Sequence, residues 1–227
     1  MSVDLIKDFR KFGKEHNMSS SVFDSYMTYI DNSYIEPTII EERQLHATQI
    51  SVFSRMFMDR ILFLGSEVNS DVANILNAQM LYLASNNPEK TISLYINSPG
   101  GSVNAGLAIY DVMNFINPDV STTCIGMAAS MGAVLLSSGA KGKRKSLLHS
   151  DIMIHQPLSG IRQAQASDIE IHCNEVKKCK KILYSILAEN CGKTYEEIEL
   201  ACDRDNWFTA QEAIEFGLID DIFKKSK

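Results

Sequence analysis

Short apolar runs alternate with segments of helical periodicity from about residue 61 to residue 154. The runs that have the composition of buried strands are 61–64, 91–96, 120–125 and 152–154. Between them, apolar or small residues recur at helical spacing over 72–83, 107–116 and 129–137. Strands that alternate with helices pair in parallel through right-handed crossovers, so the sequence predicts an α/β fold around a parallel sheet.

The last third of the chain is predicted to be more helical. Three pairs of residues have the spacing of a helix-capping box: Ser167 with Glu170, Thr194 with Glu197, and Thr209 with Glu212. The first pair opens a helix that can continue to Cys191, where Gly192 is a suitable C-cap. Such a helix is roughly 35 Å long, and its charged middle predicts at least one solvated face. Residues 218–223 are predicted as a closing strand.

The composition is that of an acidic globular protein. Hydrophobic residues make up 45% of the 227 residues, and the net charge of −6 argues against nucleic acid or anionic membrane as a partner. The five cysteines include no C-x-x-C pair, which fits free thiols in a reducing compartment rather than a zinc site or a disulfide framework. Because no secretory signal and no run long enough to span a bilayer is apparent, we expect a cytoplasmic protein.

The first 33 residues differ from the remainder, and turn signals follow at 32–37. We predict that residues 1–33 are an N-terminal extension or propeptide and that residues 34–227 form the main domain. A genuine N-terminal helix that packs on this domain is an equally good interpretation.

Ser130 is a candidate nucleophile for acyl transfer. It follows a predicted strand and opens a predicted helix, among small residues that leave its side chain accessible. The free N–H groups of a first helical turn face developing negative charge. The segment does not match the G-x-S-x-G of nucleophile-elbow hydrolases. Taken alone, it is more typical of a close-packed helix start.

Three other segments supply the remaining groups that acyl transfer needs. His155 stands at the end of a predicted strand, and Asp205 lies in a polar loop. The glycine pair that ends the loop 97–101 can present a backbone N–H to an oxyanion. Each has a plain structural alternative: a structural histidine, a helix-capping loop and an ordinary turn.

Together and in this order, these segments resemble the proteolytic subunits of the Clp protease family of serine peptidases. The resemblance is carried by residues 96–103, 126–132, 153–157 and 203–205, with support from 141–144, 166–171 and 213–220. It implies that Ser130 is the nucleophile, that His155 is the general base and then acid, and that Asp205 orients the histidine. It assigns the two oxyanion N–H groups to Gly101 and Met131, donors typically worth about 3–4 kcal/mol each.

The resemblance also implies a fold, an assembly and partners. The fold would be the crotonase-like (ClpP) α/β fold of repeated ββα units, with the long helix protruding as a handle. Two stacked heptameric rings would enclose a chamber for unfolded polypeptides, fed by an ATP-using AAA+ unfoldase of the ClpX, ClpA or ClpC type. The peptidase itself would need no metal or nucleotide cofactor. Peptides would bind by strand addition beside 101–103 and near Leu158, although the loop 157–166 is one residue longer than usual in the family.

Two surface features follow from the same resemblance. The family's apolar pocket for unfoldase loops would include Tyr95, Leu147 and Phe223, which would also suit a core, and Lys145 replaces a frequent aromatic there. Arg204, beside Asp203, resembles an ion pair between rings, or else it is a surface pair worth under about 1 kcal/mol.

Two rival functions remain open from the sequence. A CoA-ester enzyme would share the crotonase fold and an oxyanion hole, but it would not need a Ser–His–Asp set. A non-enzymatic ring subunit would only complete the assembly, and the intact set of Ser130, His155 and Asp205 argues against it.

Overall fold

The computed structural model describes residues 38–43 and 46–223, with side chains from residue 50 onward. The chain divides between Arg55 and Met56 into two compact units. The predicted extension, residues 1–33, lies outside the described residues. In the first unit, β1 (Thr38–Arg43) and β2 (His46–Ser51) pair antiparallel, with Thr38 opposite Ser51. Helix α3 (Val52–Met58) contains the boundary between the units.

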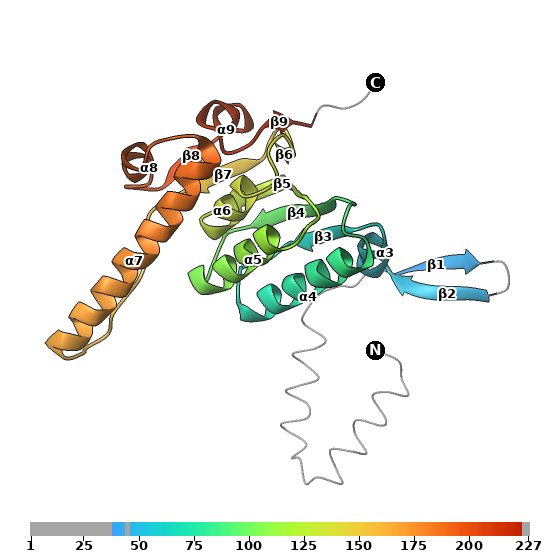
Figure 1. Ribbon diagram of the computed structural model, residues 1–227, viewed down its shortest axis with the longest axis horizontal. Coiled ribbons are helices and arrows are strands. Elements are labelled where there is room, and N and C mark those ends of the chain that lie inside the picture. The colour runs from blue at the N-terminus through green and yellow to red at the C-terminus, as the bar shows by residue number, and fades with distance from the viewer. Residues whose placement is uncertain (1–37, 44–45, 224–227) are drawn as a thin grey trace, which may run out of the picture. The chain divides into compact units, whose positions relative to one another are not determined.

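The second unit is built on a seven-stranded sheet (Figure 1). Five strands lie in the order β3 (Ile61–Leu64), β4 (Ile92–Ser98), β5 (Val120–Ala129), β6 (Arg144–Ser146) and β9 (Asp221–Ile222), all parallel. β7 (Asp151–Ile154) also pairs in parallel with β5, and β8 (Asn206–Phe208) pairs antiparallel with β7. The predicted parallel α/β sheet is therefore confirmed, with one antiparallel strand added at β8.

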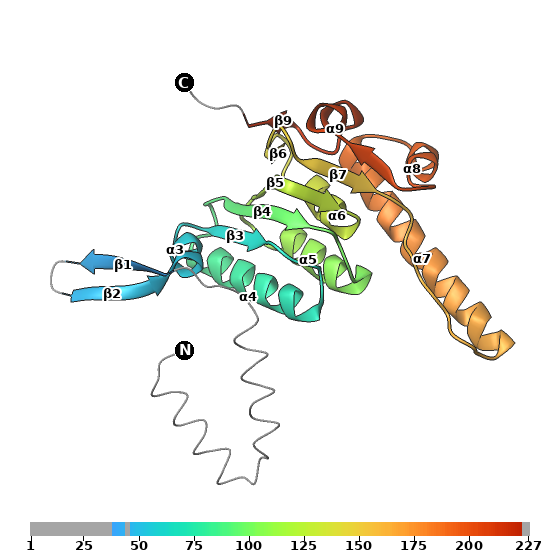
Figure 2. The same ribbon diagram turned by 180° about the vertical axis from the view of Figure 1, so that it is seen from behind.

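Helices cover one face of this sheet. Figures 1 and 2 show α4 (Ser70–Asn86), α5 (Val103–Phe115) and α6 (Met131–Ser137) on the same side of the strands. The burial of β4 follows from this arrangement: Ile92, Leu94 and Ile96 are buried, whereas Ser93 and Tyr95 between them are partly exposed. Alternate side chains of a strand point to opposite faces, so the buried set forms the core against the helices.

The long helix α7 spans Ala166–Cys191, and only its second half is packed. Its buried residues are Leu183, Tyr184, Ile186 and Leu187, so the first half projects from the core, as Figures 1 and 2 show. Gly192 ends it in the left-handed conformation, with φ of 66°, as predicted. In the described part of the chain, no helix is both long and apolar enough to cross a membrane.

Two of the three predicted capping boxes are confirmed. Thr194 and Thr209 begin α8 (Tyr195–Ala201) and α9 (Ala210–Phe216), and each exchanges hydrogen bonds with its glutamate. The backbone N–H of each threonine lowers the pKa of its partner, Glu197 or Glu212. The box at Ser167 is wrong, because α7 already begins at Ala166 and its N-cap, Gln165, makes no side-chain cap.

Several element boundaries also differ from the predictions. Strand β5 continues to Ala129, so the helix predicted over 129–137 begins only at Met131. Helix α5 begins at Val103 rather than residue 107, because the Ser102 side chain accepts a hydrogen bond from the Ala105 N–H. The predicted strand 218–223 shortens to Asp221–Ile222, since the turn after α9 occupies its first residues.

Candidate active site

Three polar side chains from distant parts of the chain form one hydrogen-bonded row. The Nε2 atom of His155 lies 2.9 Å from Ser130 Oγ, and its Nδ1 atom lies 3.1 Å from Asp205 Oδ1. With the proton on Nδ1, the imidazole donates to Asp205 and accepts from the Ser130 hydroxyl. The His155 side chain is only 12% exposed, whereas that of Asp205 is 62% exposed. The row therefore has the connectivity of a nucleophile, a base and an orienting carboxylate.

Strand pairing brings His155 and Asp205 face to face. In the antiparallel pair β7–β8, Ile154 lies opposite Asn206, so the next residues outward on each strand are His155 and Asp205. Gln156 extends this pairing: its backbone N–H donates to Cys202 O at 2.7 Å, and its side-chain Nε2 donates to Asp203 O at 2.9 Å. This role of Gln156 was not predicted from the sequence. Its position between a strand end and a proline was the signal available.

Ser130 occupies a strained turn between β5 and α6. Its φ of 55° and ψ of −121° are unusual for a residue with a side chain. Its N–H donates to Met153 O at 2.8 Å, which places it beside the strand that leads to His155. Although it occupies the N-cap of α6, its side chain makes no cap hydrogen bond. The turn therefore presents the hydroxyl to the imidazole.

The glycine loop after β4 packs directly against Ser130. A Cβ atom on Gly100 would lie 2.6 Å from Ser130 Cβ and 2.9 Å from Met131 N. Gly100 and Gly101 have φ of 90° and 145°, and Val68 fixes the loop by bonding to Gly100 O at 2.7 Å and Ser102 N at 2.8 Å. The absence of side chains at both glycines thus permits a close backbone approach beside the serine.

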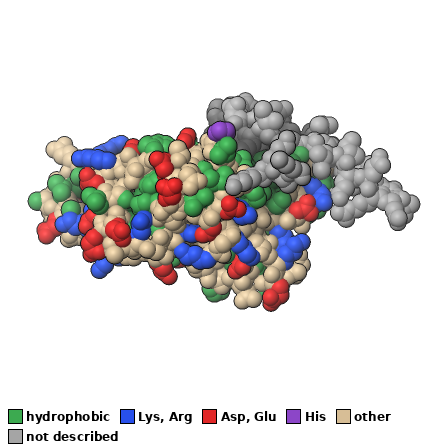
Figure 3. Space-filling model, turned by 90° about the horizontal axis from the view of Figure 1, so that it is seen from above, with side chains coloured by type: hydrophobic (Ala, Val, Ile, Leu, Met, Phe, Trp, Pro, Cys, Tyr) green, Lys and Arg blue, Asp and Glu red, His purple; other side chains and the backbone are tan. Residues whose placement is uncertain are grey.

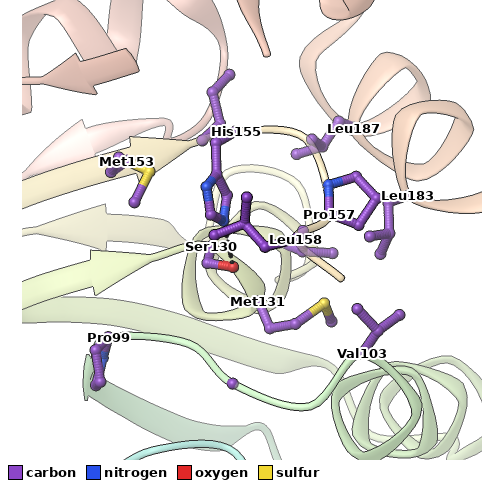
Figure 4. Close-up of a pocket in the computed structure, with 13 residues that line it drawn as sticks. Pro99, Val103, Ser130, Met131, Met153, His155, Pro157, Leu158, Leu183 and Leu187 are labelled. Atoms are coloured by element: carbon purple, nitrogen blue, oxygen red, sulfur yellow. Dashed lines mark hydrogen bonds between the residues drawn. The ribbon is translucent and has the colours of Figure 1, made fainter. Parts of the chain in front are cut away.

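A pocket of about 270 Å³ opens beside Ser130 (Figure 4). Apolar side chains from β7, the following loop and helices α5, α6 and α7 supply most of its wall, together with the serine, the histidine and Gly101. The lining residues are Pro99, Gly101, Val103, Ser130, Met131, Val134, Met153, Ile154, His155, Pro157, Leu158, Leu183 and Leu187. Both predicted oxyanion donors, Gly101 and Met131, therefore border the same space as the Ser130 hydroxyl.

The other predicted site residues lie outside this pocket. Tyr95 is on the sheet face opposite the buried residues of β4, and Leu147 and Phe223 are each 43% exposed. Lys145 Nζ lies 4.6 Å from the centre of the Phe223 ring. Arg204 is 90% exposed, and its Nε atom is 3.9 Å from Asp203 Oδ2.

Three cysteines, two of them buried and Cys191 partly buried, are poor candidates for nucleophiles. Burial raises the pKa of Cys124 and Cys191 to about 11 and that of Cys202 to about 12. These thiols remain protonated near neutral pH, and the thiolate is the reactive form. Among residues 38–43 and 46–223, no three histidine, cysteine or acidic side chains gather as a metal site would require.

Comparison with known proteins agrees with this geometry. Residues 43–226 match the family described as Clp protease. A protein of Porphyromonas gingivalis is 52% identical, over 98% of this chain and all of that protein. Proteins of Bacteroides fragilis and Bacteroides thetaiotaomicron are each 54% identical, over 96% of this chain and 99% of their own length. All three are named ATP-dependent Clp protease proteolytic subunit.

Proposed function

The chain belongs to the Clp protease family and is a serine peptidase, and we propose that Ser130, His155 and Asp205 are its catalytic triad. The observation that carries this assignment is the hydrogen-bonded row from Ser130 Oγ through the imidazole to Asp205 Oδ1. Acyl transfer requires these three groups in this order of contact. The largely buried imidazole and the partly exposed Ser130, which lines the pocket, are consistent with it.

The proposed reaction has two halves. Ser130 Oγ attacks the peptide carbonyl while His155 Nε2 takes the hydroxyl proton, and the same nitrogen then gives that proton to the leaving amine. An acyl group remains on Ser130 until water, activated by the same imidazole, hydrolyses the ester. Asp205 keeps the proton on Nδ1 and stabilises the imidazolium that forms in each half.

The proposed oxyanion hole consists of the N–H groups of Gly101 and Met131. Met131 is the first residue of α6, where backbone N–H groups have no partner within the helix. The close approach of Gly100 to Ser130 supports the proposal that the carbonyl oxygen of the substrate lies between these two N–H groups. Such donors stabilise the charge that develops in the transition state rather than the bound substrate.

The pocket supports cleavage after large apolar residues. Its walls include Val134, Leu183 and Leu187, so a leucine or aromatic side chain would leave water on entering it. The main chain of the peptide would pair as an added strand beside residues 101–103. Unfolded polypeptides supply such extended segments, whereas folded substrates do not.

The assembly and partners of this chain are part of the proposal. The relatives are named as subunits of an ATP-dependent protease, which supports an oligomer that works with an ATPase. We propose two stacked heptamers with Arg204 between the rings, and an AAA+ unfoldase that uses the ATP, so that the peptidase needs no cofactor of its own. The unfoldase would dock at Tyr95, Leu147 and Phe223, in the cytoplasm. Figure 3 shows acidic and basic side chains interspersed over one face, which supports neither nucleic acid nor membrane as a partner there.

Substitution of the serine tests the triad. Ser130→Ala should remove hydrolysis of a short fluorogenic peptide by roughly six orders of magnitude, because nucleophile and base act as one unit. The native mass of the assembly should stay unchanged. Full peptidase activity in this variant would refute the assignment, and turnover of acyl-CoA esters without peptide cleavage would favour a CoA-ester enzyme instead.

A further inference from the structure

The side chain of Ser98, the last residue of β4, is buried and makes two hydrogen bonds. Its hydroxyl donates to Ser66 O at 2.6 Å and accepts from the backbone N–H of Gly100 at 3.1 Å. A hydroxyl has one proton to donate, and Ser66 O takes it, so the oxygen lone pairs remain for Gly100. Ser98 therefore ties the glycine loop to the segment that follows β3.

Gly100 needs this tie because its own backbone has unusual freedom. With a φ of 90°, it occupies a region that glycine enters without steric cost. The two peptide groups that flank it are held separately: Ser98 Oγ binds its N–H, and the Val68 N–H binds its carbonyl oxygen at 2.7 Å. Between the two hydrogen-bonded residues, the ring of Pro99 fixes one further torsion angle. These contacts restrict Gly100 to one orientation.

The orientation of Gly100 sets the direction of the next N–H group. The carbonyl of Gly100 and the N–H of Gly101 belong to one planar trans peptide group, so they point in opposite directions. Because the carbonyl faces Val68, the N–H of Gly101 points away from Val68. Within the part of the chain that the structure describes, neither this N–H nor that of Met131 has a hydrogen-bond acceptor. Both groups are therefore free to bind a substrate oxygen.

We propose that Ser98 is a positioning residue that holds the Gly101 N–H in the direction from which it binds the oxyanion. The inference rests on the proposed roles of Ser130 and Gly101. Ser98 acts through Gly100 and does not touch the reacting atoms, since it is buried and does not line the pocket, whereas Gly101 does. In Figure 4 the glycine loop, which follows Pro99, passes below Ser130. Without the Ser98 hydroxyl, the peptide groups around Gly100 can rotate and turn the donor away.

A pair of inhibitors distinguishes this role from a general loss of activity. A peptide aldehyde adds to Ser130: its carbonyl carbon bonds to Oγ, the hydroxyl proton passes to His155 Nε2, and the carbonyl oxygen becomes the oxyanion. The corresponding peptide alcohol occupies the same pocket but forms no oxyanion. The ratio of the two inhibition constants therefore reports the stabilisation of the oxyanion rather than the binding of the peptide.

Ser98→Ala should lower kcat for a short peptide by about ten- to a hundredfold and leave KM nearly unchanged, because the oxyanion forms only in the transition state. The aldehyde should lose its advantage over the alcohol by a similar factor. Ser98→Cys fills the same space with a weaker hydrogen-bonding group and should give an intermediate loss. If native mass measurement shows that Ser98→Ala does not assemble, Ser98→Cys provides the same test.

Ser150→Ala is a matched control. Ser150 is also buried, and its hydroxyl donates to Cys124 O at 3.1 Å and accepts from the N–H of Gly126 at 3.2 Å. These contacts are of the same kind, but they lie outside the glycine loop and the pocket. Ser150→Ala should therefore lower stability in urea unfolding much as Ser98→Ala does, while kcat and the inhibitor ratio stay unchanged.

An unchanged kcat and an unchanged inhibitor ratio in Ser98→Ala, or in Ser98→Cys where only that variant assembles, would overturn the role of Ser98 alone. Equal losses of kcat and of the ratio in Ser98→Ala and Ser150→Ala would also overturn it, in favour of a general loosening of the sheet. Failure of the unsubstituted protein to cleave peptides, or to bind the aldehyde more tightly than the alcohol, would instead overturn the proposed function.

Discussion

At the scale of single residues, the geometry at Ser130 depends on the absence of a side chain at Gly100. Ser130 has a φ of 55°, and a Cβ on Gly100 would lie 2.6 Å from Ser130 Cβ and equally close to Ala129 O. Because Ala129 ends β5 and the Ser130 N–H is bonded to Met153 O, an added methyl group would displace the serine or the proposed oxyanion donors. The glycine is thus required by contact as well as by its own φ of 90°.

We therefore expect Gly100→Ala to lower kcat by about a hundredfold or more, since small displacements of reacting groups are costly. Gly142→Ala is a matched control, because Gly142 also has a positive φ of 78° but its added Cβ would meet nothing within 4 Å. It should keep its kcat and lose only stability. Peptidase assays of both variants at equal concentrations of assembled protein distinguish the two effects, and comparable kcat losses would contradict this account.

A largely buried ion pair joins the end of the sheet to three helices. Arg144 Nη2 lies 2.5 Å from Asp220 Oδ1, and Nη1 donates to three carbonyls, those of Ser137, Asn190 and Gly217. Burial alone would raise the pKa of Asp220, but the hydrogen bonds from Arg144 outweigh it and lower the pKa. A lowered pKa in the folded state contributes stability above the unfolded value of about 4, and this contribution is lost as the pH falls through the folded value.

Asp220→Asn should accordingly reduce the free energy of unfolding at pH 7 by about 3–5 kcal/mol, because it leaves the Arg144 charge buried without its partner. Stability should also depend less on pH below about 4 than in the unsubstituted protein. Asp119→Asn, which removes the exposed pair with Lys143, should cost under about 1 kcal/mol. Urea unfolding at a fixed protein concentration, at pH 7 and at lower pH, measures both. Equal losses would show that burial is not the reason.

The sequence indicated three candidate site residues, but it did not indicate the contacts that hold them. Ser130, His155 and Asp205 follow from ordered motifs, and the structure brings the three side chains together. The positive φ of Ser130 could not be predicted, because its neighbours are compatible with an ordinary helix start. The hydrogen bond between Ser159 Oγ and His172 Nε2 could not be predicted either, since it depends on the path of an exposed loop.

At the scale of elements, the pairing of β7 with β8 sets the distance between His155 and Asp205. Asp205 is largely exposed, so packing does little to fix it. The two hydrogen bonds of Gln156 to Cys202 O and Asp203 O continue the pairing beyond the last strand residues. The side-chain bond is therefore expected to hold the segment that carries Asp205 in register with the histidine.

Gln156→Ala removes that side-chain bond and should lower kcat by about ten- to a hundredfold while KM changes little. The assembly should remain intact, which native mass measurement checks. Gln211→Ala is the control, because the Gln211 side chain bonds only to Glu215 on the surface of α9, and it should behave as the unsubstituted protein. A Gln156→Ala variant with normal kcat would show that the strand pairing suffices alone.

Prediction of elements succeeded where the local pattern and the tertiary structure agree. The boxes at Thr194 and Thr209 cap their helices, because each pair precedes a packed segment. The same pattern at Ser167 failed, since the preceding loop already enters α7 at Ala166. Strand β5 extends beyond its predicted end at residue 125 because β7 pairs with Met127, Ala128 and Ala129. This pairing is a long-range contact, so no local sequence pattern predicts it.

At the scale of the whole molecule, the first half of α7 projects from the core and the Arg204 side chain is 90% exposed. Arg204 precedes Asp205, the proposed orienting carboxylate, by one position, and its Nε atom lies 3.9 Å from Asp203 Oδ2. If Arg204 joins the two rings, ring stacking and the position of Asp205 are linked. Assembly depends on surfaces of several copies, which is why the sequence predicted it only through the family resemblance.

Arg204→Ala should shift the native mass from a double toward a single ring and lower peptidase activity in parallel. Lys143→Ala, which removes an exposed basic side chain paired with Asp119, should leave both unchanged. Native mass spectrometry and peptide hydrolysis on the same samples provide the comparison. An Arg204→Ala protein that remains double-ringed and fully active would separate ring stacking from this residue.

The proposed mechanism depends most directly on the activation of Ser130 as a nucleophile by His155. Labelling with a fluorophosphonate probe, followed by mass spectrometry to locate the modified residue, measures this directly in the assembled protein. We expect modification at Ser130 in the unsubstituted protein and its loss in His155→Ala. Labelling at another serine, or labelling of Ser130 that persists at the same rate in His155→Ala, would contradict it.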